Sequence, residues 1–408
     1  MRLLCTRCGR ENAWGTLGSC PHCGGILLPV YDDARVAQLA AVAVGPGLDR
    51  YRTTLPVSVP VPYLGEGNTP LLPSHRIGPA LGVAQLYFKH EGLNPSGTFK
   101  DRVGALAAAL ALAAGAAGIL TASSGNAAAA IAAYSAAAGL PCAVLFDAEA
   151  PPAKIRQTVA YGAQAWPVAG LFTSGPDVAR ERLLAIADHL NYYLAFAWAP
   201  VNAYVSEGVK TMAYEVTGQL PGTPDAVVTP VGGGDMLAAQ WRGYRELQQA
   251  GVIDRLPRMI GVQSLQAAPL LCAFLDGATH VPTLPAATSR ISGINVPFSG
   301  DHALAAVRAS GGAVAGVDDA AVFAMQRRLA VAEGIWVEPV GAVAVAALPG
   351  LIARGEIDPA GRIVCILSGA GFKDQALAAE EARAVSGREP LPFAVEEIVH
   401  MVTQATGL

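Results

Sequence analysis

Short apolar runs alternate along this chain with alanine-rich stretches of helical character, and this rhythm constrains the fold more than any other feature. The runs are four to six residues long and rich in β-branched or apolar side chains: residues 85–89, 118–122, 142–146, 226–231, 259–262 and 362–367. Strands that alternate with helices form largely parallel sheets covered by helices. The sequence therefore predicts an α/β fold, with functional loops where strands end and helices begin.

The composition narrows the class of partner. With 408 residues, of which 52% are hydrophobic and 15% charged, the chain can bury the cores of two large domains. The net charge of −4 and pI near 6.0 provide no basic field for nucleic acid or an anionic membrane. Residues 104–120 are apolar, but alanine and glycine dominate them, so we expect a core helix followed by a strand and no membrane span. A small-molecule partner is expected.

Four of the seven cysteines lie within the first 23 residues, as Cys5-x2-Cys8 and Cys20-x2-Cys23 with an eleven-residue spacer. This spacing is typical of a tetrahedral structural zinc site, and such a short segment needs metal to fold. The first cysteine comes before a signal-type apolar run can form, so we expect a cytoplasmic protein. In that compartment a disulfide or redox pair is the less favoured alternative.

Changes in composition divide the chain. We expect a zinc ribbon over residues 1–30 and a proline-rich linker with one short helix over 31–62. A two-lobed region with the strand and helix alternation follows over 63–385, with a smaller lobe at about 105–215. Residues 386–408 are expected to form a C-terminal tail.

The first distinctive loop follows the run 85–89 and leads into a helix that is expected to begin near Lys100. A lysine beside Phe99 at such a junction could lie in a desolvated pocket, where its pKa falls and a neutral amine becomes available. An isolated lysine is usually a solvated surface charge, so this loop alone does not establish a reactive amine.

The second loop, Ser123-Ser124-Gly125-Asn126, lies between the run 118–122 and an alanine-rich helix. Serine and asparagine at this point could simply cap the helix. The same hydroxyl and backbone N–H groups could also bind a carboxylate.

The third loop, Gly232-Gly233-Gly234-Asp235, follows the run 226–231 and precedes a helix that is expected to reach about residue 249. Consecutive glycines let backbone N–H groups converge on a phosphate, although a glycine run can also be only a flexible turn. A Walker lysine and the spaced dinucleotide fingerprint are missing. A fourth candidate, Ser368, follows the run 362–367, where a lone serine is usually a turn residue.

Together, and in this order along the chain, these motifs resemble the fold-type II pyridoxal-phosphate enzymes. The segments GEGNTPL (65–71), NPSGTFKDR (94–102) and SSGNA (123–127) are most similar to the threonine synthase branch, some members of which carry an N-terminal zinc ribbon. The resemblance covers nearly the whole chain. It implies two domains with parallel-rich sheets flanked by helices, plus the small ribbon, and makes 63–385 the catalytic region.

The resemblance also implies roles for individual residues. Lys100 would carry pyridoxal 5'-phosphate as a Schiff base and then remove the substrate α-proton. The cofactor would be bound by Asn126 at its 3′-oxygen, by Gly232, Gly233, Gly234 and Asp235 at its phosphate, and by Ser368 at its pyridine nitrogen. A neutral hydroxyl there favours elimination or replacement over transamination. The substrate carboxylate would be bound by Ser123, Ser124 and Gly125, with Thr69 nearby.

One segment departs from the threonine synthase pattern. Threonine synthases commonly have an Asn-Ser pair and an arginine ahead of a Gly-Gln-Lys-Thr element, and these bind the substrate phosphate. Aligned on Gly208 and Lys210, the serine position here is Pro200 and the arginine position is Val205. The loss of a charged phosphate donor removes an interaction of about 1.5–3 kcal/mol. We therefore expect O-phosphohomoserine to be a poor substrate.

The sequence thus predicts a threonine synthase-like lyase or synthase that eliminates or replaces a β- or γ-group of a hydroxy- or phospho-amino acid. A serine or threonine ammonia-lyase is the enzymatic alternative. A zinc-ribbon binding module on an inactive enzyme scaffold is the alternative of another class, although it would predict a lost lysine or a basic patch, and the sequence has neither. Enzymes of this fold type are often dimers, which makes a homodimer the assembly to test.

Overall fold

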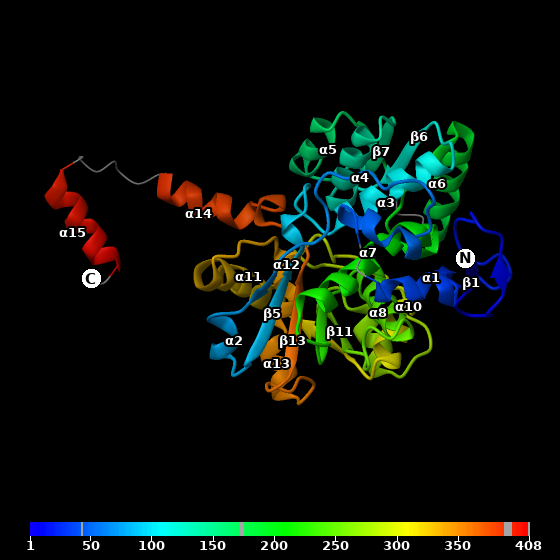
Figure 1. Ribbon diagram of the computed structural model, residues 1–408. Coiled ribbons are helices and arrows are strands. Elements are labelled where there is room, and N and C mark those ends of the chain that lie inside the picture. The colour runs from blue at the N-terminus through cyan, green and yellow to red at the C-terminus, as the bar shows by residue number, and fades with distance from the viewer. Residues whose placement is uncertain (42–43, 172–174, 387–393, 407–408) are drawn as a thin grey trace. The chain divides into compact units, whose positions relative to one another are not determined.

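A computed structural model describes residues 1–41, 44–171, 175–386 and 394–406. These residues form two compact units, Met1–Lys373 and Asp374–Leu408 (Figure 1). The second unit contains helices α14 (Ala376–Ser386) and α15 (Val395–Thr406). The expected start of the tail at residue 386 adjoins residues 387–393, which lie outside the described residues. Within the described ranges, no helix has both the length and the apolar character that crossing a bilayer requires.

A small antiparallel sheet opens the first unit, with strand order β2-β1-β3. Its strands are β1 (Arg2–Cys5), β2 (Glu11–Asn12) and β3 (Leu27–Val30). The linker that follows contains α1 (Asp33–Ala37) and the short 3-10 helices η1 (Gln38–Ala40) and η2 (Gly47–Thr54). Leu48 and Leu55 of this segment are fully buried in the main core, so this part of the linker is packed.

The larger sheet of the first unit has six strands in the order β12-β11-β10-β13-β5-β4. Their bounds are β4 (Leu71–Pro73), β5 (Gln85–His90), β10 (Ala226–Pro230), β11 (Arg258–Ser264), β12 (Ala313–Val317) and β13 (Arg362–Leu367). All neighbouring pairs are parallel except the edge pair β4 and β5. Strands β10, β13 and β5 are therefore adjacent and end at the same edge of the sheet.

A second, parallel sheet of the first unit has four strands in the order β8-β7-β6-β9, and Figure 1 labels two of them, β6 and β7. Its strands are β6 (Gly118–Ala122), β7 (Cys142–Asp147), β8 (Gln164–Val168) and β9 (Tyr192–Leu194). This arrangement of parallel-rich sheets flanked by helices confirms the predicted fold class.

Helices cover both sheets of the first unit. They are α2 (Ile77–Ala80), η3 (Glu91–Leu93), α3 (Lys100–Ala113), α4 (Asn126–Ala137), η4 (Pro152–Lys154), α5 (Arg156–Ala160), α6 (Pro176–Leu190), α7 (Ala199–Gln219), α8 (Asp235–Gln249), α9 (Pro269–Leu275), α10 (Asp301–Ala309), α11 (Asp319–Arg328), the π-helix η5 (Leu329–Glu333), α12 (Pro339–Ala346), α13 (Leu348–Ala353) and η6 (Gly371–Lys373).

Helix α3 is the expected core helix, and strand β6 follows it as predicted. The helix is buried along nearly its whole length because alanines give it small side chains on every face. A Cβ atom at Gly104 would lie 2.7 Å from the carbonyl oxygen of Ala130, so glycine is needed where α4 crosses. Close packing accounts for this apolar stretch.

Candidate active site

The lysine, glycine and Ser368 loops meet because they follow three adjacent parallel strands. Strand β5 leads to Lys100, β13 ends immediately before Ser368, and β10 leads to the glycine loop. In parallel sheets, ligands bind at the carboxyl ends of the strands, where such loops gather. The fourth loop, at residues 123–126, follows β6 of the smaller sheet.

Backbone hydrogen bonds connect the lysine loop to the Ser368 loop. The Phe99 N–H donates to the Ser368 carbonyl at 3.0 Å, and the Ala370 N–H donates to the Gly97 carbonyl at 2.8 Å. The Thr98 hydroxyl also donates to the Ser368 carbonyl, at 3.2 Å, across 270 positions of sequence. The two loops are thus held together mainly by the main chain.

Lys100 is the first residue of α3, as predicted, and its side chain has the electrostatics of a reactive amine. Burial lowers the pKa of its amino group, and this effect outweighs the charges of Asp235 and Glu338, which act to raise it. The Nζ atom lies 4.7 Å from the centre of the Phe99 ring. Strand β13 lies between β10 and β5, so the glycine loop after β10 is at the same edge of the sheet as the lysine loop after β5.

Glu338 connects two of the predicted cofactor ligands. The Asn126 Nδ2 donates to both of its carboxylate oxygens, at 2.8 and 3.1 Å, and the Ser368 Oγ donates to Oε1 at 3.2 Å. A side chain at Gly369 would collide with this carboxylate. Glu338 also precedes α12 at its N-cap position, where a glutamate can favour the first turn of a helix, but its contacts with Asn126 and Ser368 make it part of the site.

The serine loop does not cap its helix with a side chain. Helix α4 begins at Asn126 after Gly125, and no side-chain oxygen accepts a capping hydrogen bond there. The Ser123 Oγ accepts from the Gly125 N–H at 3.2 Å and so shapes the loop itself. The simple capping interpretation is therefore not supported, and the start of α4 offers N–H groups to a ligand.

The glycine loop is packed against other segments. A Cβ atom at Gly234, where φ is +97°, would lie 2.6 Å from Ala303 Cβ, and one at Gly233 would lie 3.0 Å from Trp198. The Gly233 carbonyl accepts from the Gly300 N–H at 2.9 Å. Among the described residues, no hydrogen bond leaves the N–H groups of the three glycines. The loop is a close-packed turn with donors to spare, which fits a phosphate.

Asp235 uses its side chain to hold α7. Its Oδ1 accepts from the Ala199 N–H at 2.6 Å and lies 3.3 Å from His302 Nε2. A contribution of Asp235 to a phosphate site would therefore come from its backbone N–H.

Thr69 lies in a buried ion network. Its hydroxyl donates to Glu91 at 2.6 Å, and its carbonyl accepts from Lys89 at 2.7 Å. Arg102 pairs with both Glu91 and Glu215 in the same network, and its side chain is fully buried. The Thr69 hydroxyl is committed to this network.

The segment that departs from the threonine synthase pattern forms the first turns of α7. Both Pro200 and Val205 are buried, and Val205 belongs to the main apolar core. The neighbouring Lys210 is fully buried and pairs with Glu207 at 2.7 Å and Glu246 at 2.9 Å. Lys210 and Arg102 are thus neutralised by carboxylates and cannot replace the missing arginine.

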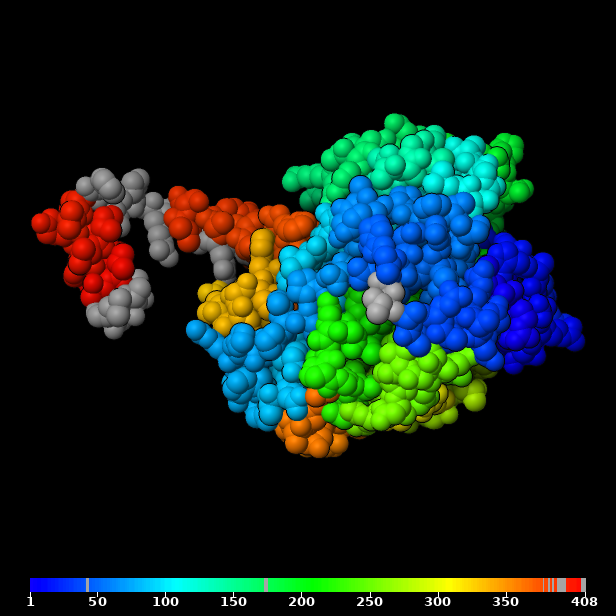
Figure 2. All heavy atoms as spheres, viewed as in Figure 1, coloured from blue at the N-terminus to red at the C-terminus, as the bar shows by residue number. Residues whose placement is uncertain are grey.

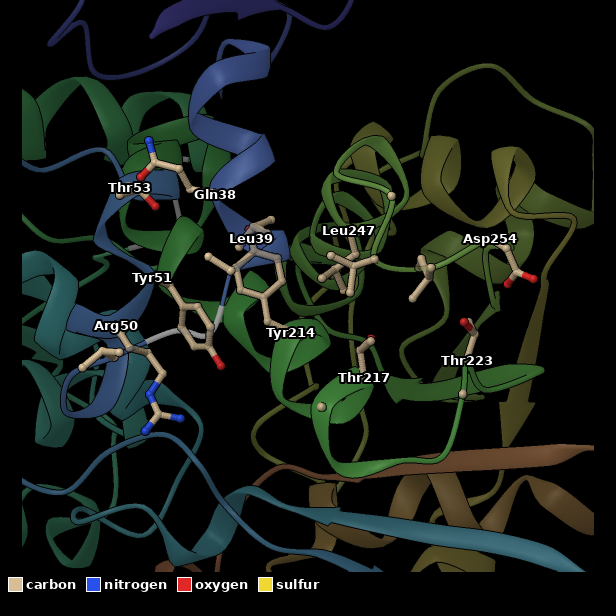
Figure 3. Close-up of a pocket in the computed structure, with 17 residues that line it drawn as sticks. Gln38, Leu39, Arg50, Tyr51, Thr53, Tyr214, Thr217, Thr223, Leu247 and Asp254 are labelled. Carbon is tan, nitrogen blue, oxygen red and sulfur yellow. The ribbon is translucent and has the colours of Figure 1, made fainter.

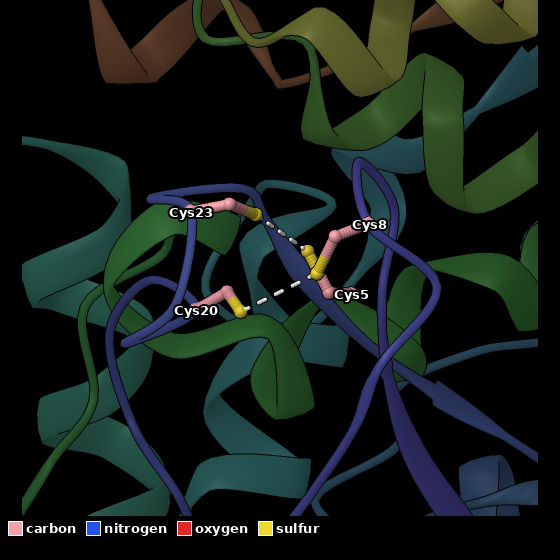
Figure 4. A group of neighbouring side chains, drawn as sticks. All are labelled: Cys5, Cys8, Cys20 and Cys23. Carbon is pink, nitrogen blue, oxygen red and sulfur yellow. Dashed lines mark hydrogen bonds between the residues drawn. The ribbon is translucent and has the colours of Figure 1, made fainter.

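The four N-terminal cysteines come together as the sequence predicts. Their sulfur atoms all lie within 4.8 Å of one another (Figure 4). Two close pairs are Cys5 with Cys23 at 3.4 Å and Cys8 with Cys20 at 3.9 Å, and all four are free thiols. Four clustered thiols are consistent with a zinc ribbon.

The ribbon packs against the start of α7. The Gly18 N–H donates to the Val201 carbonyl at 2.8 Å, and the Gly15 N–H donates to the Tyr204 hydroxyl at 2.9 Å. Arg7, between two of the cysteines, pairs with Asp301 at 3.5 Å. Figure 2 shows the ribbon in dark blue at the edge of the first unit, beside the blue linker.

A pocket of about 750 Å³ lies elsewhere, where the linker meets the C-terminal ends of α7 and α8 (Figure 3). Tyr51 and Tyr214 face it, with Arg50 and Asp254 among its lining residues. None of the predicted site residues lines this pocket, so it is separate from the candidate active site.

Sequence reasoning missed Trp198 and Ser299, which lie against the glycine loop. Neither belongs to a recognisable motif. The nearest sequence signal was the Gly300-Asp301-His302 segment, which directly follows Ser299. From the sequence, its histidine is only a possible positive charge in place of the missing arginine.

Comparisons with known proteins agree with this geometry. Residues 63–369 match the family described as pyridoxal-phosphate dependent enzyme. The chain is 34% identical over 382 residues to a threonine synthase of Methanosarcina acetivorans, covering 91% of this chain and 92% of that one. It is 36% identical over 351 residues to a threonine synthase of Mycobacterium tuberculosis, covering 85% and 94%.

Two solved structures have a similar fold. Maize serine racemase matches with a TM-score of 0.67 and 23% identity, covering 78% of this chain and 93% of that one. A threonine deaminase from the organism abbreviated T.th. matches with a TM-score of 0.63 and 26% identity, covering 80% and 94%.

The fold, the loops and these comparisons define the class: the chain belongs to the pyridoxal-phosphate-dependent enzymes. Within that class it is a threonine synthase-like lyase.

Proposed function

We propose that this enzyme eliminates or replaces a β- or γ-substituent of a small amino acid, with pyridoxal phosphate attached to Lys100. One observation carries this proposal. The loops after three adjacent strands gather Lys100, Ser368 and the glycine loop at one edge of the sheet, and Glu338 links Ser368 to Asn126 from the smaller sheet.

The residues present fit the cofactor. Unused N–H groups in the glycine loop suit its phosphate. Asn126 and Ser368 donate to Glu338 in this structure, and they would exchange that partner for the 3′-oxygen and the ring nitrogen of the cofactor. When bound, pyridoxal phosphate supplies an electron-accepting ring that stabilises negative charge at the substrate α-carbon. Ser368 offers that ring a neutral hydroxyl, which favours elimination or replacement over transamination.

Lys100 and the serine loop act on the substrate. Ser123, Ser124 and the N–H groups at the start of α4 bind the carboxylate and so fix the position of the α-carbon. The lowered pKa of Lys100 favours its neutral amine, which is the form that can accept the α-proton. Thr69 is committed to Glu91, so we assign the carboxylate to residues 123–125 alone.

The leaving group is small or uncharged. A cationic donor would strengthen the binding of a phosphate leaving group, but Val205 lies in the apolar core and Lys210 and Arg102 are paired with buried carboxylates. O-Phosphohomoserine is therefore a poor substrate. Deamination of serine or threonine is the second candidate, because a threonine deaminase shares the fold over 80% of this chain.

We also propose that Cys5, Cys8, Cys20 and Cys23 hold one structural zinc ion. The proximity of their sulfur atoms supports this assignment. A cytoplasmic location and a homodimer stay predictions from the sequence.

A substrate panel tests the reaction. Purified holoenzyme is offered O-phosphohomoserine, O-phosphoserine, serine, threonine and their acetylated analogues, while phosphate, oxo acid and new amino acids are measured. The matched control is Lys100→Ala under the same conditions. The proposal predicts Lys100-dependent loss of a neutral substituent, and it is wrong if every amino acid is returned unchanged by the cofactor-loaded enzyme.

A further inference from the structure

Polar side-chain atoms without partners gather around the glycine loop. The Nε1 of Trp198, the Oγ of Ser299 and the Nδ1 of His302 are all buried, and none has a hydrogen-bond partner in the described part of the chain. Ser299 and His302 are 8% and 6% exposed. Folded proteins rarely leave such atoms unpaired, so their clustering calls for an explanation.

Two of these atoms face glycines of the loop. A Cβ atom on Gly234 would lie 3.2 Å from the Ser299 Oγ, and one on Gly233 would lie 3.3 Å from the Trp198 Nε1. The two side chains come from different segments, one before α7 and the other before α10. They therefore add side-chain donors to the unused N–H groups of the glycines.

This set of groups selects the kind of ligand. An indole N–H and a backbone N–H can only donate, and a hydroxyl can do so. The start of α8, a helix of fifteen residues, contributes a partial positive charge at the same place. A tetrahedral oxyanion with several acceptor oxygens, such as a phosphate monoester, is the ligand that matches these donors.

The Asp235 carboxylate would repel such an anion unless its charge were engaged elsewhere. Its Oδ1 accepts from the Ala199 N–H, and His302 approaches the same oxygen at 3.3 Å. Ser206 lies at 3.5 Å from that oxygen. The other oxygen, Oδ2, lies 3.3 Å from the position that a Cβ atom on Gly233 would take, so the hold on Oδ1 decides how far the charge turns toward the loop. His302 thus lies where it can hold the carboxylate on α7.

We propose that Ser299 and Trp198 donate to the phosphate of the cofactor, and that His302 is a positioning residue that keeps Asp235 turned toward α7. The proposal rests on the proposed function, since it requires pyridoxal phosphate to bind with its phosphate at the glycine loop.

Cofactor affinity tests the two donors. The apoenzyme forms of wild type, Ser299→Ala and Trp198→Phe are titrated with pyridoxal phosphate and with pyridoxal, which lacks the phosphate. Binding is followed by the visible absorption of the attached cofactor, and the phosphorus resonance of bound pyridoxal phosphate is recorded. The matched controls are Ser58→Ala, at an exposed serine, and Trp166→Phe, at a tryptophan that is 49% exposed.

Each donor variant is expected to bind pyridoxal phosphate about tenfold more weakly, since a hydrogen bond to a charged group is lost. Its pyridoxal affinity should match wild type, and its phosphorus resonance should shift. An equal loss for both ligands, or no loss, would overturn the proposal. So would unchanged cofactor affinity with a raised KM confined to phosphorylated substrates, which would assign the donors to substrate phosphate. If wild type binds neither ligand at Lys100, the proposed function itself fails.

A second variant pair tests the positioning role. His302→Gln should weaken pyridoxal phosphate binding, and adding Asp235→Asn should restore it, because a neutral amide repels no phosphate and can still accept from the Ala199 N–H. A double variant that binds no better than His302→Gln would show that repulsion by Asp235 is not the cause.

Discussion

Replacing Arg102 by methionine should destabilise the enzyme by about 3 kcal/mol at neutral pH, the low end of the cost of breaking a buried ion pair. Arg102 lies two residues after Lys100 and donates to both oxygens of Glu91, at 2.8 Å, and to both oxygens of Glu215, at 2.7 Å. Lys89 supplies the second positive charge of this buried network. Without Arg102, two buried carboxylates would share one lysine, and breaking a buried ion pair in this way costs about 3–5 kcal/mol.

The pKa of Glu215 gives a second measure of this cost. Burial alone would raise its pKa, but the charges of Arg102 and then Lys89 outweigh burial and lower it from 4.5 to about 2. A difference of this size corresponds to roughly 3 kcal/mol. Because the folded pKa is below the unfolded value, this stabilisation is present above pH 4.5 and is lost as the pH falls toward 2.

The stability lost by the Arg102→Met variant should become smaller as the pH falls. With Arg102 gone, the pKa values of the buried carboxylates rise, so protonation at low pH relieves their burial. The loss of stability should therefore be larger at about pH 7 than at about pH 4. Urea unfolding followed by tryptophan fluorescence, or unfolding rates if refolding is incomplete, measures both values.

Arg182→Met is the matched control, since Arg182 is an exposed residue of α6 and its loss should change stability by less than about 0.5 kcal/mol. Neutralising Glu91 as glutamine in the Arg102→Met background should recover stability, because Glu215 then stays paired with Lys89. A loss below about 1 kcal/mol near neutral pH, or a loss that is as large at about pH 4, would refute the reasoning.

Three further predictions concern the site and the ribbon. Lys100→Ala should remove the visible absorption of the bound cofactor and turnover while the far-ultraviolet circular dichroism is kept; wild-type turnover would exclude this lysine. Metal analysis should find one zinc per chain, and chelation should expose the ribbon to proteolysis first while the cofactor stays bound; disulfide-paired Cys5, Cys8, Cys20 and Cys23 without zinc would contradict this. Steady-state kinetics should give a lower kcat/KM for O-phosphohomoserine than for an acetylated or hydroxyl substrate. The reverse order would show that Val205 in place of an arginine does not weaken the binding of a substrate phosphate.

The strands that the sequence predicted are those with continuous apolar runs. Two runs, 118–122 and 362–367, coincide with β6 and β13, and four others match strands within one or two residues at each end. Strand β8 was missed because its mixed side chains include Pro167 and an exposed tryptophan. Strand β9 has only three residues, and β4 and β12 are edge strands with weak patterns. Short or exposed edge strands carry little periodicity of their own.

Residues of the candidate site could be predicted from the sequence where a single loop carries a motif. Contacts between loops could not be predicted, because they depend on the order of the strands. The order of β10, β13 and β5 brings Ser368 beside the lysine loop, and no local pattern encodes this order. The commitment of Thr69 to Glu91, and the pairing of Lys210 with Glu246, depend on side chains farther away in the sequence. Conversely, two Cys-x2-Cys pairs at this spacing suffice to predict the cysteine cluster, because four such thiols are the ligand set of a structural zinc site.

The attachment site of the cofactor is the central claim, and it can be measured directly. The holoenzyme is treated with borohydride, which makes the bond between lysine and cofactor permanent, and is then digested and sequenced by mass spectrometry. The chain has five lysines, so every possible site can be scored. The account predicts the phosphopyridoxyl mass on Lys100 alone; the same mass on Lys89, Lys154, Lys210 or Lys373 with Lys100 unmodified would contradict it.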